Sequence, residues 1–234
     1  LIYILLTFIC SVLYLISGMT GFDSIAHAMT TISTGGFSTH NNSLAAYNSI
    51  NIEIVSIIFM ILGSLPFVVY LKSFYGDWKT LFRDDQIKLL FIIIFLLVII
   101  TSFWLNINYN ENILYCIRVS IFNITSILTG TGYTSDNYNL WGTFGISAIF
   151  LIMFIGGCAG STTGGIKIFR LQLLFRGAKT QIKKLIHPHG VFVTNFNEKS
   201  VSEETINSIM VFFFIYIIIF ILSACFFSFF YIDF

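Results

Sequence analysis

The stretch Thr34-Gly35-Gly36-Phe37-Ser38-Thr39-His40 decides the fold, because this run of glycines and small hydroxylated residues lies between segments suited to lipid. A second version, Thr129-Gly130-Thr131-Gly132-Tyr133-Thr134-Ser135-Asp136, follows 96 positions later and places Gly132 on Gly36. Glycines let backbone carbonyls turn inward, and an aromatic ring beside them stiffens the loop. A backbone of this kind replaces water around a bare cation. The two loops therefore predict an ion-conducting pore.

The composition is that of an integral membrane protein. Hydrophobic residues make up 56% of the 234 and charged residues 10%, with a mean hydropathy of +0.88. The four cysteines show no CxxC spacing, so neither a disulfide framework nor a bound metal cluster is expected. The net charge of +1 gives no reason to expect a nucleic-acid partner. No nucleophile with a base is visible at membrane depth, which argues against an enzyme.

Apolar and polar segments alternate in a repeated order. Residues 1 to 17 form an apolar helix, which looks cut at its start, and Asp23 is expected to cap a short half-helix ending at Ile32. A span from Ile52 to Leu71 follows, with Gly63 and Pro66 expected to kink it.

The same order then recurs with different residues. A span covers 89 to 105, a second half-helix covers 115 to 128, and a span at 144 to 155 resumes at 166 to 175 after a glycine-rich interruption. A further helix covers 206 to 231. The fold predicted is an all-α polytopic membrane protein with repeated units of span, re-entrant pore helix, filter loop and span.

Charge placement predicts the orientation of these units. The links 72–88 and 167–204 hold eleven of the twelve Lys and Arg residues, which places them on the cytoplasmic side. The opposite side carries mainly acids: Asp23, Glu53, Glu111, Asp136 and Asp233. Acids at the mouth, together with the partial negative charge at the carboxyl ends of the half-helices, favour a cation over an anion.

Two stretches carry a family resemblance, HAMTTISTGGFSTH at 27–40 and FIGGCAGSTTGGIKIFR at 154–170, joined by KKLIHP at 183–188. The chain resembles the Trk/Ktr/HKT superfamily of potassium transporters, and most of all the bacterial Trk-type membrane subunit. The resemblance implies four M1-P-M2 units around one pore. Residues 1–75 would be the second of these M1-P-M2 repeats, with a truncated first helix. Residues 89–176 would be the third repeat, with a broken second span, and residues 205–234 would be the first helix of the fourth. Residues 76–88 and 177–204 would be a cytoplasmic link and a cytoplasmic basic segment.

The resemblance also implies a potassium filter, with K⁺ held there as the transported ion and no cofactor or other metal in the chain. The filter residues carried over by position are Ser33, Thr34, Gly35, Gly36, Phe37, Thr129, Gly130, Thr131, Gly132 and Tyr133. Thr131 between two glycines is a departure that brings the second loop closer to a potassium-channel filter. Half of the filter is absent from this piece, so the piece alone should not conduct.

The glycine-rich interruption beneath the filter predicts a flexible gate, and the resemblance implies an intramembrane loop that closes the path from inside. The gating residues expected are Gly156, Gly157, Gly160, Ser161, Thr162, Thr163, Gly164 and Gly165. The rival interpretation is a kinked helix packed closely through small residues. A phosphate-binding P-loop does not fit, because Ile166 rather than Lys follows the last glycine.

Partners and location follow largely from the resemblance. It implies a homodimer in the bacterial inner membrane and a cytoplasmic nucleotide-binding regulatory subunit, while the basic segment 176–184 suits the anionic surface of the lipid bilayer. The alternative function is a Na⁺- or H⁺-coupled secondary carrier with discontinuous helices. A carrier usually keeps an ionisable residue at membrane depth. The spans here offer only Arg118 and Glu53, near their ends.

Overall fold

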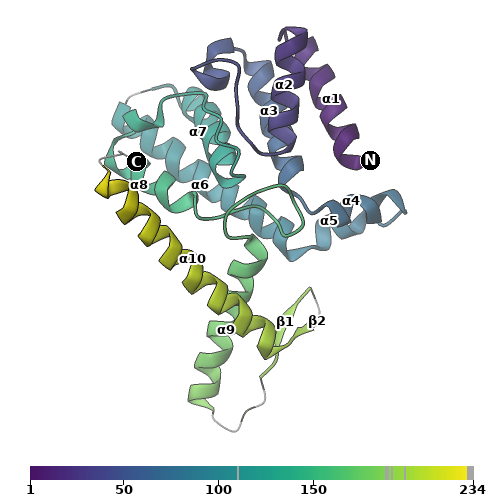
Figure 1. Cartoon of the computed structure of the whole chain (residues 1–234), viewed down its shortest axis with the longest axis vertical. Coiled ribbons are helices and arrows are strands. Elements are labelled where there is room, and N and C mark those ends of the chain that lie inside the picture. The colour runs from purple at the N-terminus through teal and green to yellow at the C-terminus, as the bar shows by residue number, and fades with distance from the viewer. Residues whose placement is uncertain (110, 188–189, 191, 198, 231–234) are drawn as a thin grey trace. The chain divides into compact units, whose positions relative to one another are not determined.

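The computed structural model describes residues 1–109, 111–187, 190, 192–197 and 199–230. The chain divides into two compact units, Leu1–Ile168 and Phe169–Phe234. The first unit is built from helices and loops, and the second from two helices and a short hairpin (Figure 1). The last four residues of the predicted helix 205–234 lie outside the described residues.

The first half of unit one contains five α-helices and one short 3-10 helix. These are α1 (Ile2–Ile16), α2 (Gly21–Ile32), η1 (Ser43–Tyr47), α3 (Ile50–Ser64), α4 (Phe67–Phe74) and α5 (Lys79–Arg83). The expected cap of the half-helix was wrong by three positions, because Thr20 is the N-cap of α2. Its hydroxyl accepts from the Asp23 backbone N–H at 3.1 Å and donates to the Asp23 carboxylate at 2.7 Å.

The predicted kink in the following span is confirmed. Helices α3 and α4 meet at 90° across a short break. Leu65 and Pro66 take extended backbone angles there, and proline has no N–H with which to continue the helical hydrogen bonds.

The second half of unit one repeats the plan with helices of different length. It contains α6 (Asp85–Tyr109), α7 (Ile113–Leu128), η2 (Tyr138–Leu140) and α8 (Gly142–Ile152). Helices α1, α2 and α3 pack together on one side of the unit, and α6, α7 and α8 on the other, with α3 against α7 joining the two halves (Figure 1). By length and apolar composition, α6 and α10 (Glu203–Phe229) can each cross a membrane, and the bent pair α3 and α4 makes a third span if taken as one.

The predicted interrupted span has a longer interruption and a longer second part in the structure than in the prediction. Helix α8 ends at Ile152, and the chain is non-helical until α9 (Ile168–Ile186) begins. Helix α9 then runs eleven residues past the expected end at Phe175, through the basic segment. Lys, Gln, Leu and Arg are strong helix formers, so their local preference extends the helix.

Unit two holds α9, the antiparallel hairpin of β1 (Thr194–Phe196) and β2 (Lys199–Val201), and α10 (Glu203–Phe229). Helix α10 starts three residues before the predicted span, because the Ser202 hydroxyl caps it by accepting from the Thr205 N–H at 3.3 Å. The hairpin was not predicted.

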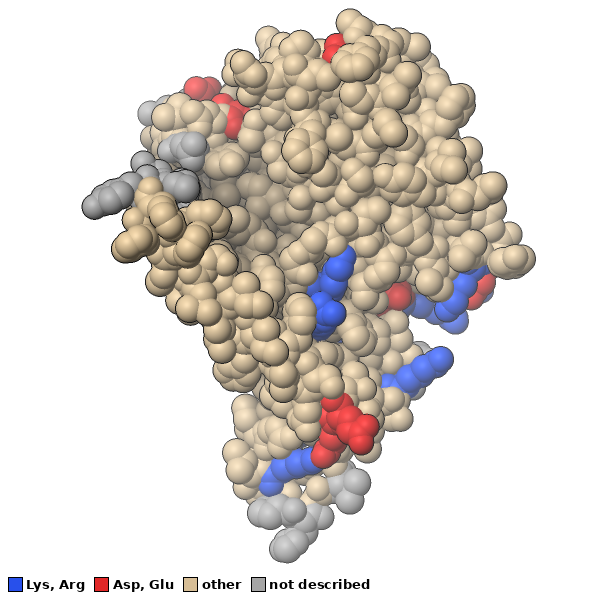
Figure 2. Space-filling view, viewed as in Figure 1, with Lys and Arg blue, Asp and Glu red and all other residues tan. Residues whose placement is uncertain are grey.

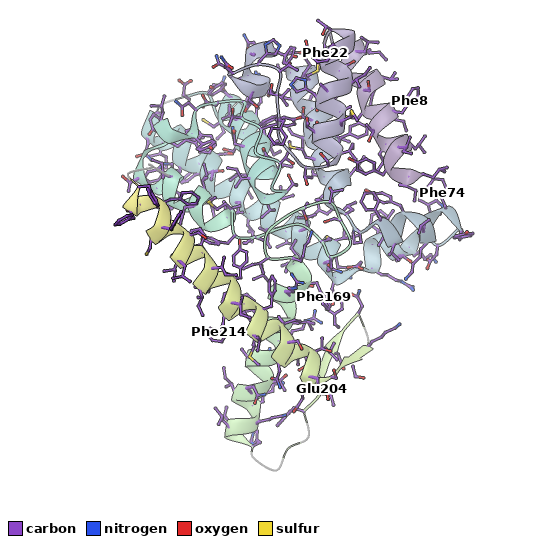
Figure 3. All side chains as sticks on the ribbon, viewed as in Figure 1. Phe8, Phe22, Phe74, Phe169, Glu204 and Phe214 are labelled. Atoms are coloured by element: carbon purple, nitrogen blue, oxygen red, sulfur yellow. The ribbon has the colours of Figure 1, made fainter. Side chains whose placement is uncertain are left out.

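Much of the surface is apolar, as a lipid-facing protein requires. Phe8 on α1, Phe22 on α2 and Phe214 on α10 are each at least 65% exposed and point away from the ribbon (Figure 3). Inside unit one, the Tyr14 hydroxyl lies 2.9 Å from the Thr31 hydroxyl and 2.8 Å from that of Ser56, which ties α1, α2 and α3 together.

One ion pair joins the two halves of unit one. Arg118 on α7 donates from Nε and Nη2 to the two carboxylate oxygens of Glu53 on α3, both at 2.7 Å. The Glu53 side chain is 6% exposed and that of Arg118 31%. The paired geometry neutralises a carboxylate that would otherwise be costly to bury.

Removing the arginine tests this inter-half contact. We expect Arg118→Met to lower the stability of the purified protein by about 3–5 kcal/mol, because it leaves the Glu53 carboxylate buried and unpaired. The double variant Glu53→Gln/Arg118→Met should recover much of that loss in a thermal melt. Arg83→Met, at an exposed position, is the control. Equal melting temperatures for Arg118→Met and Arg83→Met would contradict the assignment.

Candidate functional site

The two glycine loops leave the carboxyl ends of α2 and α7 with the same backbone hydrogen bonds. In the first loop the N–H groups of Gly35 and Gly36 both donate to the Thr30 carbonyl, at 2.8 and 3.4 Å. In the second loop those of Thr131 and Gly132 both donate to the Ser126 carbonyl, at 2.9 and 3.2 Å. Each pair differs by 96 positions, so the sequence repeat extends to individual hydrogen bonds.

The backbone of each loop alternates in handedness. Thr34 and Gly36 have φ of 53° and 68°, and Gly130 and Gly132 have 69° and 85°, while the residue between each pair has negative φ. In an extended strand successive residues face opposite sides. Left-handed angles at every second residue break that alternation, which is the backbone pattern that lets neighbouring carbonyls face one side.

Thr34 is the costly member of this set. It is a β-branched residue at positive φ, at the position where the second loop has Gly130, and such a conformation is a genuine outlier. The Thr34 hydroxyl donates to the Ser33 carbonyl at 2.7 Å, which helps to hold it. Backbone strain of this kind persists where the surrounding structure enforces it.

Side chains and glycines alternate between buried and exposed along the second loop. Thr129, Thr131 and Tyr133 are at most 3% exposed, whereas Gly130 and Gly132 are exposed. The side chains thus anchor the loop on the protein side and leave its glycine backbone on the open side.

The two loops approach each other closely at Gly36. A Cβ atom added to Gly36 would overlap the Thr131 carbonyl oxygen and lie 2.8 Å from its carbonyl carbon. A Cβ added to Gly132 would meet nothing within 4 Å. Both glycines are required by their backbone angles, but only Gly36 is also required by space.

Tyr133 of the second loop is held by the pore helix of the first half. Its hydroxyl lies 2.5 Å from the Thr30 hydroxyl and donates to the His27 carbonyl at 3.2 Å. The Thr30 hydroxyl in turn lies 2.9 Å from the Phe37 carbonyl oxygen. Phe37, the equivalent of Tyr133 in the first loop, is 78% exposed and is not packed into such a site by the residues that the structure describes.

Two buried side chains, those of His27 and Asn123, anchor the loops from behind, and the second was missed from the sequence. His27 Nδ1 donates to the Asp23 carbonyl at 2.8 Å, which leaves Nε2 to accept from the Ser38 hydroxyl at 2.9 Å. Asn123, also fully buried, donates to the Ser135 hydroxyl at 3.1 Å. His27 and Asn123 differ by 96 positions, so extending the repeat backward into the helices would have identified Asn123 as the equivalent of His27.

The glycine-rich stretch 156–165 is a folded loop rather than a kinked helix, so the rival interpretation fails. Its ends are joined by hydrogen bonds from Gly156 N–H to the Ile166 carbonyl at 2.8 Å and from Ile166 N–H to the Phe154 carbonyl at 2.9 Å. Side chains at Gly156 would overlap the Gly164 carbonyl oxygen, and those at Gly157 would clash with Thr163. Gly160 and Gly165 need positive φ.

Polar side chains hold the loop closed on itself. The Thr163 hydroxyl accepts from the Gly157 N–H at 3.0 Å and lies 2.8 Å from the Ser161 hydroxyl. The Lys167 ammonium donates to the Thr163 carbonyl and hydroxyl oxygens. Gln86 at the start of α6 accepts from the Ala159 N–H at 2.7 Å.

The structure brings this loop to the base of the glycine loops. The Thr162 hydroxyl lies 2.9 Å from the carbonyl of Ile32, the last residue of α2, and 3.0 Å from that of Gly63 in the bent span. Gly164 faces Gly130, since a Cβ on Gly130 would lie 3.6 Å from the Gly164 nitrogen. All the predicted filter and gating residues belong to unit one, where the loop 156–165 contacts both glycine loops.

A polar cavity of about 430 Å³ lies beyond the glycine loops, lined by Asn41, Asn42, Asp136 and Asn137 among others. The first half closes on the second here, because the Ala45 N–H donates to the Thr134 carbonyl at 3.1 Å. On the face drawn in Figure 2, Lys and Arg of unit one gather near α4 and α5 with acids beside them, and acids alone show at the opposite end. Within the part of the chain that the structure describes, no three His, Cys, Asp or Glu residues gather to hold a metal.

Comparisons with known proteins agree on one family. The family model described as "TrkH: Cation transport protein" matches residues 1–232. The chain is 36% identical over 217 residues to the potassium uptake protein TrkG of Escherichia coli K12, covering 92% of the chain and 44% of that protein. It is 34% identical over 216 residues to TrkI of Halomonas elongata, with the same coverage of 92% and 44%.

A solved structure has the same fold. The crystal structure of the potassium transporter TrkH from Vibrio parahaemolyticus matches with a TM-score of 0.89 and 29% identity, over 94% of this chain and 48% of that one. The chain spans about half the length of the relatives it matches.

The unequal surroundings of the two loop glycines give a stability test. Gly132→Ala should cost about 1–2 kcal/mol, the strain of a left-handed alanine. Gly36→Ala should cost clearly more, because its methyl group must also push Thr131 away. Thermal melts of the purified protein measure both, with Gly18→Ala, at φ of 105° in open space, as control. Melting of Gly36→Ala at the temperature of Gly18→Ala would refute the close approach.

Proposed function

The chain belongs to the TrkH family of cation transport proteins, and on that premise we propose that it forms part of a potassium uptake pathway across a membrane. The ion would pass the two glycine loops without its water, held by backbone carbonyls from 33–37 and 129–133. No covalent chemistry is involved. Because the chain covers about half the length of its relatives, glycine loops from the rest of the protein would complete the ring of loops around the ion.

The repeated backbone of the two loops carries this proposal. Carbonyls replace the hydration shell of K⁺ only when several face one lumen. Alternating φ signs in both loops turn neighbouring carbonyls to one side, and the approach of Gly36 to Thr131 supports placing the two loops at one lumen. The helices α2 and α7 end at these loops, so their partial negative charge favours a cation.

The exposed Phe37 supports an incomplete ring. Tyr133 is buried against α2 of the preceding half, and by repetition Phe37 would pack on the pore helix of a unit preceding this one. Such a unit would lie in the part of the relatives that this chain does not cover.

We propose that the loop 156–165 is the gate. Non-helical backbone at membrane depth is tolerated where protein buries it or where it lines a watery path. The Thr162 hydroxyl joins this loop to the carbonyl of Ile32, at the end of α2 just before the first glycine loop, and to the carbonyl of Gly63 in the bent span. On this proposal the hydrogen-bonded loop is the closed gate, and opening requires those hydrogen bonds to break.

A coupled carrier is less well supported. The ionisable residues that the sequence offered near membrane depth, Glu53 and Arg118, are engaged with each other through two hydrogen bonds. A carboxylate held this way is poorly suited to taking up and releasing a proton or Na⁺ on each cycle.

We propose the partners and the location from the family alone. A homodimer, a bacterial inner membrane and a cytoplasmic nucleotide-binding regulatory subunit would suit a Trk-type chain. The relatives themselves are named as Trk system potassium uptake proteins.

Rubidium uptake tests the filter. In cells without their own potassium uptake that express the complete gene, wild-type protein should take up rubidium in the presence of competing Na⁺. Gly36→Ser and Gly132→Ser should both lose resistance to Na⁺, because each disturbs carbonyls that replace water. Gly36→Ser should also lose most uptake, because its side chain displaces the facing loop.

Gly18→Ser is the matched control, since it places a serine at positive φ outside both loops. Its uptake and Na⁺ resistance should equal those of the wild type. Wild-type protein that moves no rubidium, or loop variants that behave like Gly18→Ser, would reject the filter.

Thr162→Val tests the gate. It keeps the side-chain shape but removes a hydroxyl that holds the loop closed, and a lost hydrogen bond of about 0.5–1.5 kcal/mol shifts an equilibrium severalfold. We expect a severalfold higher rate of rubidium uptake. Thr7→Val, which removes only a hydrogen bond within α1, should leave the rate unchanged. Unchanged flux in Thr162→Val would remove this residue from the gate.

A further inference from the structure

Unit two has a basic cavity that belongs to neither the proposed filter nor the proposed gate. A space of about 180 Å³ lies between α9 and β1. Its cationic lining residues, Arg176, Lys179 and Lys183, follow one face of α9 at spacings of three and four. No acid lines it among the residues that the structure describes.

Two hydroxyls complete the lining. Thr180 Oγ1 on α9 and Thr194 Oγ1 on β1 lie 3.1 Å apart at the cavity. Hydroxyls beside several cations form the donor set that binds phosphate oxygens. We infer that this cavity binds the phosphate group of an anionic membrane lipid.

The cations are held in place by the hairpin. Arg176 Nη1 donates to the Asn195 carbonyl at 2.6 Å, and its guanidinium lies 5.6 Å from the centre of the Phe196 ring. The Lys183 ammonium lies 5.9 Å from the Phe192 ring. The hairpin thereby gives the cavity its second wall and fixes the spacing of the charges.

The contacts between α9 and α10 show where along α10 the cavity lies. Arg170 stacks on Phe212 at 3.9 Å, Gly177 packs against Ile206, and Lys184 pairs with Glu203. The two helices are therefore antiparallel, and residues 176–183 lie level with the first turns of α10. The apolar run of α10 begins at those turns, so the cavity lies at head-group level (Figure 3 labels Glu204 there).

An exposed apolar stripe selects a lipid over a free anion. Phe175, Ile182 and Ile186 share a face of α9 next to the cations and are 72%, 58% and 65% exposed. A phospholipid can place its phosphate on the cations and its acyl chains along this stripe, as amphipathic helices do at interfaces. Inorganic phosphate gains only the first contact.

Native mass spectrometry of the complete protein in detergent tests the site, with phosphatidylglycerol as probe and phosphatidylcholine as the uncharged comparison. Lys179→Gln/Lys183→Gln should weaken phosphatidylglycerol binding by about tenfold or more, given the attraction of each surface lysine to anionic lipid. Lys179→Arg/Lys183→Arg keeps the charge and should retain binding. Melting without lipid confirms that each variant is folded.

The control is Lys72→Gln/Lys79→Gln, which removes the same charge from unit one and should leave binding unchanged. Equal losses in both Gln pairs would show a general charge effect and overturn the site. Millimolar inorganic phosphate should not displace the lipid. Displacement by phosphate alone would show a free-anion site and overturn the lipid assignment.

Discussion

The approach of Gly36 to the Thr131 carbonyl is the constraint on which the rest of unit one depends. Two loops can come this close only if no side chain separates them and if each is held from behind. The helices α2 and α7 fix the start of each loop, and Tyr133 fastens the second loop to the first half. The pair of Glu53 on α3 with Arg118 on α7 joins the two halves. These contacts together give the irregular backbone the protein surroundings that a bilayer requires of it.

The glycine-rich loop obeys the same requirement by different means. Its backbone groups are satisfied by its own ends, by the bent span and by Gln86, so it can remain non-helical between α8 and α9. Thr162 contacts the first glycine loop through the last carbonyl of α2, and Gly164 lies against Gly130 of the second. The proposed gate thus contacts both loops of the proposed filter.

Local signals made part of this structure predictable. Glycines marked the loops, the ends of the half-helices at Ile32 and Leu128 followed from them, and Pro66 marked the bend. Other features depend on partners distant in sequence, as Glu53 does on Arg118, and no local pattern reveals such a pair. The left-handed Thr34 was missed because a β-branched residue disfavours that conformation. The hairpin was missed because its residues show no strong local preference for strands.

The most direct test of the central claim is an anomalous difference map from crystals of the complete protein grown in rubidium. The account predicts anomalous peaks in direct contact with backbone carbonyl oxygens from both 33–37 and 129–133. Peaks confined to acidic side chains, with none along the two glycine loops, would contradict it.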